Sequence, residues 1–188
     1  WPKMFGGFTN TFSYKGFDLS VLLTATFGND IYNMLSMVNS KTSRFYTSRN
    51  LMLDVMNYAR LTEKDGQVVL QNPGTNVPRL TGSQIANDNN YNVISTRWEE
   101  DGSFVRLKNV SLSYNVPASF IAKQKVVRGV RATVGAQNLM TFTKYSGYDP
   151  EVGASVGGNV NAQNQAIGLD YGRYPLTPIY SFSLNVNF

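Results

Sequence analysis

Apolar and small polar residues alternate along five stretches of the chain, and a period of two indicates β-strands rather than helices. In 17–27, every odd position is apolar, and every even position except Leu22 is Asp, Ser or Thr. Eleven residues is also the length of a tilted strand that crosses a membrane. The sequence therefore predicts five strands, at about 4–14, 17–27, 103–114, 129–142 and 178–188.

Two local signals refine this pattern. Lys15 and Gly16 separate the first two strands, and a two-residue connection that contains glycine predicts a tight β-hairpin. In the third strand, the apolar positions change from odd to even numbers near Lys108 and Asn109. A shift by one residue is what a β-bulge leaves in a sequence, so we expect a bulge at that point.

Charged residues are nearly excluded from the five predicted strands. The strands contain only Asp18, Arg106, Lys108 and Arg131, each on the polar face or beside the predicted bulge. The polar face otherwise holds Ser, Thr, Asn and Gly. A charge that faces lipid costs about 2–4 kcal/mol at the middle of a bilayer, so this exclusion favours a transmembrane antiparallel β-barrel. A soluble β-sandwich, which also alternates, is the alternative that this pattern leaves open.

The connections between the predicted strands alternate in length. Two are short, at 15–16 and 115–128, and two are long, at 28–102 and 143–177. Barrels of the outer membrane have short periplasmic turns and long extracellular loops. The long connections are therefore predicted to be extracellular.

The connection 28–102 contains a helical pattern of its own. Leu51, Val55 and Ala59 recur at intervals of four residues. This spacing predicts a short amphipathic helix over 48–60, with Ser48 as its N-cap.

Composition excludes several classes of function. The chain has no cysteine and no histidine, which excludes a disulfide scaffold, Ser-His or Cys-His catalysis and His-ligated zinc within it. Its 17 basic and 12 acidic residues give a net charge of +5, and the basic residues are scattered, so no nucleic-acid partner is indicated. No stretch of 18 apolar residues predicts a transmembrane helix.

Aromatic residues gather near the ends of the predicted strands, as in the two aromatic girdles of membrane barrels. The residues assigned to these girdles are Tyr14, Phe17, Phe27, Tyr114, Phe142 and Tyr180.

An ordered set of motifs resembles the C-terminal β-barrel portion of SusC/RagA-type TonB-dependent outer-membrane transporters. The run QNLMTFTKYSGYDPE is the most specific of them, and the aromatic last residue adds to it. The resemblance extends over essentially the whole chain. Its matching stretches are 6–33, 77–80, 98–117, 134–151 and 182–188.

The resemblance implies that residues 1–188 form the last part of a barrel of about 22 strands. The plug domain and the segment that contacts TonB are not present, so we expect the chain to be a C-terminal fragment. Its first residues, Trp1 and Pro2, do not look like a natural start. The implied location is the outer membrane of a Gram-negative bacterium, in contact with its lipid.

The function implied by the resemblance is active import of a large nutrient, a glycan or a peptide. The implied partners are a SusD-like surface lipoprotein over the extracellular mouth and TonB, through the missing N-terminal part. A passive outer-membrane porin and a soluble β-sandwich carbohydrate-binding module are the alternatives. No cofactor is implied, and the sequence does not identify the substrate.

Candidate site chemistry is confined to the motif loop, whose residues are Tyr145, Tyr148, Asp149, Pro150 and Glu151. These residues could bind a sugar or a metal, but the spacing of the acids is not that of an EF-hand. A structural role, in which the loop is fixed as it leaves the strand, is the favoured interpretation. No catalytic, cofactor-binding or metal-binding residue is assigned, and the chain is not expected to be an enzyme.

The last strand is expected to matter for assembly. It ends in alternating apolar residues, and the final residue is aromatic. The resemblance implies that the barrel-assembly machinery recognises this terminal strand. The residues assigned to this signal are Phe182, Leu184, Val186 and Phe188.

Overall fold

The computed structural model describes residues 1–40, 50–79, 94–121, 126–152 and 168–188. These residues form two compact units, which are described separately. Unit 1 comprises Trp1–Ile31, Asp101–Val152 and Arg173–Phe188. Unit 2 comprises Tyr32–Glu100 and Gly153–Gly172.

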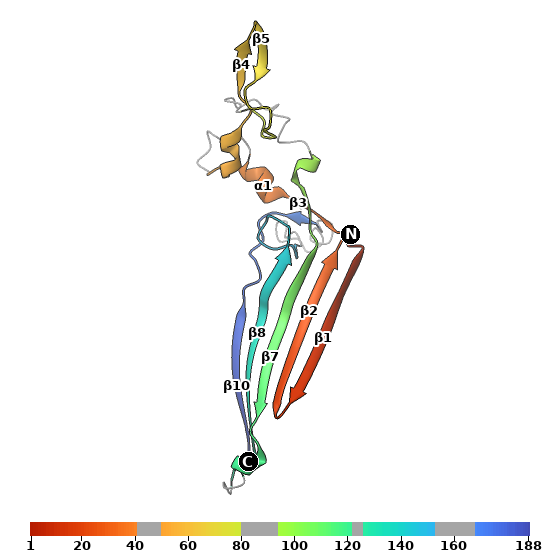
Figure 1. Ribbon diagram of the computed structural model, residues 1–188, viewed down its shortest axis with the longest axis vertical. Helices are drawn as coiled ribbons and strands as arrows, with labels where there is room; N and C mark the ends of the chain where they lie inside the picture. The colour runs from red at the N-terminus through yellow and green to blue at the C-terminus, as the bar shows by residue number, and fades with distance from the viewer. Residues whose placement is uncertain (41–49, 80–93, 122–125, 153–167) are drawn as a thin grey trace, which may run out of the picture. The chain divides into compact units, whose positions relative to one another are not determined.

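Unit 1 contains a five-stranded antiparallel sheet (Figure 1). Its strands follow one another in the sheet in the same order as in the chain, as an up-and-down meander with no crossover. Each strand begins and ends within one residue of the predicted bounds. The strands are β1 (Met4–Tyr14), β2 (Phe17–Phe27), β7 (Phe104–Asn115), β8 (Gly129–Thr143) and β10 (Ile179–Asn187).

The predicted hairpin between β1 and β2 is confirmed. Lys15 has φ 45° and Gly16 has φ 85°, and two successive positive φ angles define the turn whose twist matches a two-residue hairpin. Gly16 is also required for space, because a Cβ atom there would lie 2.9 Å from the carbonyl oxygen of Asn115.

The predicted bulge in β7 is confirmed as well. Leu22 of β2 is opposite Asn109, and Leu23 is opposite Leu107, so Lys108 is the extra residue of β7. The extra residue moves the apolar positions of β7 from odd to even numbers.

A second irregularity lies beside the first and was not predicted. Leu107 is opposite Met140 and Asn109 is opposite Gln137, so β8 has two residues where β7 has only Lys108. One of these two, Asn138, adopts the left-handed region with φ 50°, which asparagine tolerates better than branched residues do. Relative to β2, β8 therefore has two extra residues, and its apolar positions keep even numbers along its whole length.

One face of the sheet is apolar across all five strands. The register aligns one row of apolar residues from β1 to β10, since directly opposed residues point to the same face. Phe12 and Phe182, at the two edges, are 59% and 71% exposed, so this face is a surface and not a core. The row consists of Phe12, Leu19, Leu112, Val134 and Phe182.

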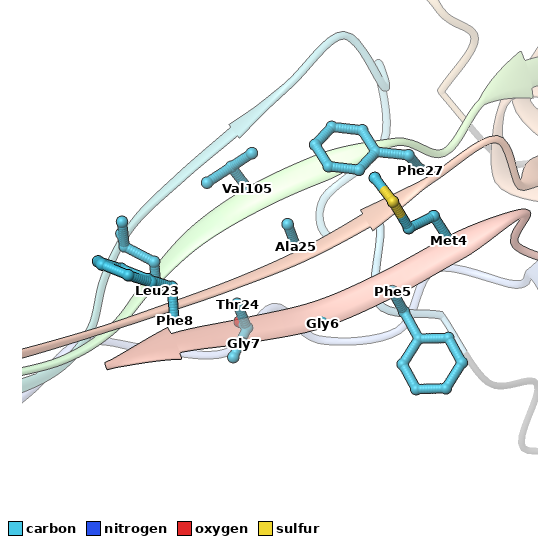
Figure 2. Close-up of a pocket in the computed structure, with 10 residues that line it drawn as sticks. All are labelled: Met4, Phe5, Gly6, Gly7, Phe8, Leu23, Thr24, Ala25, Phe27 and Val105. Atoms are coloured by element: carbon cyan, nitrogen blue, oxygen red, sulfur yellow. The ribbon is translucent and has the colours of Figure 1, made fainter. Parts of the chain in front are cut away.

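The opposite face is polar. In the neighbouring row, small hydroxyl residues follow one another across the sheet, interrupted only by a glycine in β8. Figure 2 shows the two faces at one end of β1, where Phe8 and Phe5 extend to opposite sides of the strand. The polar row consists of Thr11, Ser20, Ser111, Gly135 and Ser181.

The charged residues of the strands lie where the sequence predicts them. Asp18 is opposite Ser13 and Ser113, Arg106 is opposite Thr24 and Thr141, and Arg131 is opposite Asn115 and Asn185. All three rows belong to the polar face, and Lys108 occupies the bulge. The apolar face is therefore free of charge in all five strands.

Unit 2 consists of short elements around a small core. Met37 and Trp98 are buried and pack with Tyr32, Met34 and Val38. Helix α1 (Met34–Asn39) begins at Asn33, whose side chain accepts a hydrogen bond from the amide of Ser36 at 2.8 Å. No helix in the described part of the chain is long and apolar enough to cross a membrane.

The remaining elements of the described residues are short. The three-stranded sheet has the order β6-β3-β9, and the two-stranded sheet pairs β4 with β5. A four-residue helix, α3, lies between β7 and β8 in unit 1 and is the last of the short elements. The bounds are β3 (Asp30–Asn33), η2 (Leu53–Asn57), β4 (Leu61–Lys64), β5 (Gln67–Leu70), η3 (Thr96–Trp98), β6 (Glu99–Asp101), β9 (Leu169–Asp170) and α3 (Ala118–Ile121).

The prediction of an amphipathic helix over 48–60 is wrong. Only η2, a five-residue 3₁₀ helix, forms there, and the proposed cap Ser48 lies outside the described residues. Met52 stands at the N-cap without a side-chain hydrogen bond, and a helix this short is marginal without a cap. The chain then turns to extended backbone at Tyr58, and the amide of Arg60 donates to the side chain of Asn72 at 2.9 Å.

Candidate functional site

Arg106 lies at the centre of a buried polar cluster on the polar face of the sheet. Its side chain is 1% exposed, and its Nε donates to Thr141 Oγ1, in the same row on β8, at 2.9 Å. A buried charge is strongly unfavourable unless it is paired and hydrogen-bonded. The remaining guanidinium nitrogens must therefore find anionic partners.

Two carboxylates of the motif loop provide them. Arg106 Nη2 lies 2.5 Å from Asp149 Oδ1, and Nη1 lies 2.7 Å from Glu151 Oε2. Asp149 is buried with the guanidinium, whereas the Glu151 side chain is 51% exposed. Lys108, the bulge residue, brings its ammonium to 4.0 Å from the same Glu151 oxygen.

Asp149 also joins the two ends of the connection 143–177. Its Oδ1 accepts the amide of Glu151 at 2.9 Å, and its Oδ2 accepts the amide of Leu176 at 3.1 Å. Burial by itself would raise the pKa of Asp149, but these two backbone donors and the Arg106 guanidinium outweigh burial and lower it below its ordinary value. The Asp149 carboxylate therefore stays ionised and acts as an acceptor, not as an acid.

The rest of the motif loop packs around this carboxylate. Tyr145 is buried, and its ring lies over Gly147, where a Cβ atom would come within 3 Å of the ring. Arg173 donates to the backbone oxygen of Glu151 at 3.4 Å. Tyr148, by contrast, points outward and is 66% exposed. We call Arg106, Asp149, Glu151 and Leu176 the loop clasp, since together they hold both ends of the connection against the sheet.

A second polar cluster lies on the same face at the hairpin end of the sheet. Asp18 accepts hydrogen bonds from Ser13 at 2.7 Å and Asn115 at 3.1 Å, and its carboxylate lies 3.3 Å from Arg131. Both members of this ion pair are partly exposed, unlike Arg106 and Asp149. Exposed pairs of this kind contribute little to stability because water and salt screen them.

The whole chain aligns with TonB-dependent receptors. No family model matches the chain. TonB-dependent receptor P3 of Formosa agariphila is 35% identical over 189 residues, and receptor P26 of the same organism is 29% identical over 187 residues. Each alignment covers 100% of this chain, which spans only 16% and 17% of the two relatives.

Solved structures give the same result. The chain matches the RagAB peptide transporter with a TM-score of 0.73 at 27% identity, and the RagAB peptide importer in its 'closed-closed' state with a TM-score of 0.74 at 28% identity. Each match covers 100% of this chain and 17% of the solved one. The chain belongs to the TonB-dependent receptor family. Its five-stranded sheet is a segment of an outer-membrane β-barrel of the SusC/RagA type. Barrels of this kind turn an apolar band toward lipid, so we infer that the apolar face is the lipid-facing one.

The aromatic residues assigned to girdles all lie in the receptor's five-stranded sheet. Tyr14, Phe17 and Tyr114 share one row at the hairpin end, where the rings of Phe17 and Tyr114 are 4.4 Å apart. Phe27 and Phe142 lie toward the opposite end of β2 and β8. Tyr180 is opposite Ala136, in the row of Val110 and therefore inward of that end. The girdle role of these residues stays a prediction.

The residues assigned to the assembly signal line one side of the receptor's last described strand. Phe182, Leu184 and Val186 lie on the apolar side of β10, and Phe188 follows the end of the strand. All are exposed. Their recognition by the assembly machinery stays a prediction, because the position of the side chains does not test it.

The sequence analysis did not predict that Arg106 lies at the centre of the loop clasp. Arg106 was noted only as a tolerated charge on the polar face, and its partners lie 43 and 45 residues away in the chain. A single arginine in a strand otherwise poor in charge was the available signal. Asp149 and Glu151 were assigned to a structural role, but nothing in their spacing pointed to Arg106.

We expect Arg106→Ala to release the connection 143–177 in the full-length receptor. The substitution leaves the Asp149 carboxylate buried without a counter-charge, a loss of about 3–5 kcal/mol for a buried pair. Hydrogen exchange of the Leu176 amide measures this release, because that amide donates to Asp149.

Arg131→Ala is the matched control, since it removes an arginine from a partly exposed pair on the same face. It should change exchange at Leu176 little. The double variant Arg106→Leu with Asp149→Leu should lose less than Arg106→Ala, because it leaves no buried charge unpaired. Equal protection of Leu176 in Arg106→Ala and in Arg131→Ala would contradict the loop clasp.

Proposed function

We propose that the full-length protein imports a large nutrient across the outer membrane and takes the energy from TonB. The observation that carries this proposal is the match of the whole chain to proteins named as TonB-dependent receptors and to a peptide importer. Because the chain spans about a sixth of those relatives, the activity belongs to the whole protein and not to this segment.

The substrate that we propose is an oligopeptide or an oligosaccharide. The similarity to the RagAB peptide transporter favours a peptide. The polar face, which we take to line the lumen, presents rows of hydroxyl and amide groups and the partly exposed pair of Asp18 and Arg131. Such a surface forms hydrogen bonds with either class of polymer and does not discriminate strongly by charge.

The proposed orientation places the long connections outside the cell. The short connections, at Lys15–Gly16 and around α3, then face the periplasm, as in other outer-membrane barrels. The resemblance to SusC/RagA-type transporters supports a SusD-like surface lipoprotein as the partner of the long connections. In this arrangement the loop clasp fixes the base of one of those connections.

The import proposal predicts that uptake depends on TonB. Cells that express the full-length protein should accumulate labelled oligopeptides or oligosaccharides, and deletion of TonB should reduce uptake to the level of cells without the protein. A protonophore should have the same effect, because the energy comes from the inner-membrane proton gradient. Uptake that continues without TonB would instead indicate a passive porin.

The orientation predicts which engineered cysteines are accessible from outside. The chain has no cysteine of its own, so a single Glu63→Cys in β4 or Ala118→Cys in α3 can be followed specifically. A membrane-impermeant maleimide should label Glu63→Cys on intact cells, and less so when the surface lipoprotein is co-expressed. Ala118→Cys should react only after the outer membrane is permeabilised, and the reverse order would refute the orientation.

A further inference from the structure

One row of the polar face departs from the pattern of small hydroxyl groups. It lies two residues along each strand from the row of Ser20 and Ser111, so it belongs to the same face. In the inner strands β7 and β8 this row presents two side-chain amides, and an aliphatic residue stands on either side of them. The row consists of Thr9, Leu22, Asn109, Gln137 and Ile179.

Leu22 is the apolar exception among the even positions of β2, and its side chain does lie on this polar face. A Cβ atom at Gly7 would lie 3.8 Å from Leu22 Cδ1 and 3.9 Å from Thr24 Cγ2. Thr24 is opposite Arg106, in a row of the polar face. The alternation of the strand does not explain a leucine here, whereas contact with a partly apolar ligand does.

The bulge of β7 adds a lysine beside the two amides. Lys108 precedes Asn109 in the chain, and its ammonium lies 4.0 Å from Glu151 Oε2 on the polar face. A bulge re-aims a side chain in this way. Asn109 and Gln137 are directly opposite each other, a pairing that places Cβ atoms about 4.5–5.5 Å apart. Three groups that carry N–H donors therefore gather on one part of the polar face.

These three groups are open to a ligand. Within the described ranges, the side-chain amides of Asn109 and Gln137 make no hydrogen bond, and the Lys108 ammonium has only its 4.0 Å contact with Glu151. Gln137 is exposed, and the Lys108 side chain is 36% exposed.

The charges beside this row are balanced. Arg106 and Lys108 stand against the carboxylates of Asp149 and Glu151, and each carboxylate has a cation within 4.0 Å. A charged ligand would disturb this balance. The group that fits the row is therefore neutral, with hydrogen-bond donors and acceptors of its own.

We propose that this row binds the main chain of an extended peptide substrate on the lumen wall. A side-chain amide carries an N–H donor and a C=O acceptor in one plane, so Asn109 and Gln137 each match the C=O and N–H of a peptide bond. Lys108 donates to a further carbonyl oxygen. Main-chain hydrogen bonds give affinity that does not depend on the sequence of the peptide, and Leu22 and Ile179 lie where they can contact its apolar side chains.

The inference rests on the import proposal and on the assignment of the polar face to the lumen. It narrows the substrate to a peptide. A peptide bond has the planar donor and acceptor pair that the amides match, and the row has no aromatic ring on which a sugar would stack.

Peptides with and without main-chain N–H groups test the proposal on the purified full-length receptor. We expect a fluorescently labelled library of random hexapeptides to bind about tenfold more tightly than the same library with N-methylated peptide bonds. Asn109→Leu combined with Gln137→Met should remove this difference, because both acceptor oxygens for the peptide N–H groups are lost. Lys108→Met should instead weaken both libraries alike, since N-methylation leaves the carbonyl oxygens in place.

Three further variants serve as controls. Asn185→Leu removes an amide from the same face at the hairpin end, opposite Arg131, and should keep the tenfold difference. Lys108→Arg should restore binding that Lys108→Met loses, and hydrogen exchange at Leu176 should be unchanged in both because the loop clasp is intact. Gln137→Met alone should reduce the difference if the double variant does not assemble.

Three outcomes would overturn the proposal. The first is equal binding of the two libraries by the unsubstituted receptor. The second is an undiminished difference in the double variant, in barrels of normal heat-modifiable mobility, which would indicate that the row is covered in the full-length protein. The third is a larger loss of affinity for maltohexaose than for hexapeptides in that variant, which would show that the row binds sugar hydroxyls.

Uptake separates these results from the import proposal. TonB-dependent uptake at a saturating concentration of hexapeptides should persist in every variant, because the row affects affinity and not the supply of energy. Failure of the unsubstituted receptor to take up any hexapeptide would contradict peptide import, and this inference with it.

Discussion

A surface that faces lipid does not tolerate charge, and this constraint determines how the five strands of the sheet are aligned. Successive side chains of a strand point to opposite faces, so a slip of one residue would move every polar group of that strand into the bilayer. The structure avoids this in β7 by placing Lys108 in a bulge at the point where the apolar positions change from odd to even numbers. In β8, two residues, Asn138 and Leu139, lie opposite Lys108 alone. The apolar positions of β8 therefore keep even numbers on both sides of the bulge.

The same constraint explains where the polar interactions of the barrel segment are found. Arg106, Asp18 and Arg131 all lie on the polar face, and each has its partners there. Arg106 is the more demanding case because its guanidinium is almost wholly buried. Its partners come from the motif loop, so satisfying one buried charge also fixes the base of a 35-residue connection. The loop clasp thus links the chemistry of a strand to the placement of the loop.

The elements that follow from alternation could be predicted from the sequence, since each strand has its own local pattern. The bulge at Lys108 could be predicted because one extra residue shifts the apolar positions of β7 from odd to even numbers. The irregularity at Asn138 gives β8 two extra residues relative to β2, so its apolar positions do not shift and the sequence pattern does not reveal it. The β4–β5 hairpin was overlooked, although Asp65 and Gly66 between its strands are a recognised turn signal.

Features that depend on distant residues could not be predicted. The contact between Arg106 and Asp149 joins residues 43 positions apart, and neither residue's neighbours in sequence indicate the other. The helix expected over 48–60 failed for the same reason. Its pattern of Leu51, Val55 and Ala59 was local, whereas the chain is extended from Tyr58 onward and is bonded through the amide of Arg60 to Asn72, twelve residues further on.

The lipid-facing assignment is tested most directly at two adjacent residues of β10. Leu184 lies on the apolar face and Ser183 on the polar face of the same strand. In the full-length barrel, Leu184→Arg should lower the free energy of unfolding in lipid by about 2–4 kcal/mol, and Ser183→Arg by much less. Heat-modifiable gel mobility of barrels refolded into vesicles, titrated with urea, measures both. Equal losses at the two positions would contradict the two-faced sheet on which the whole account rests.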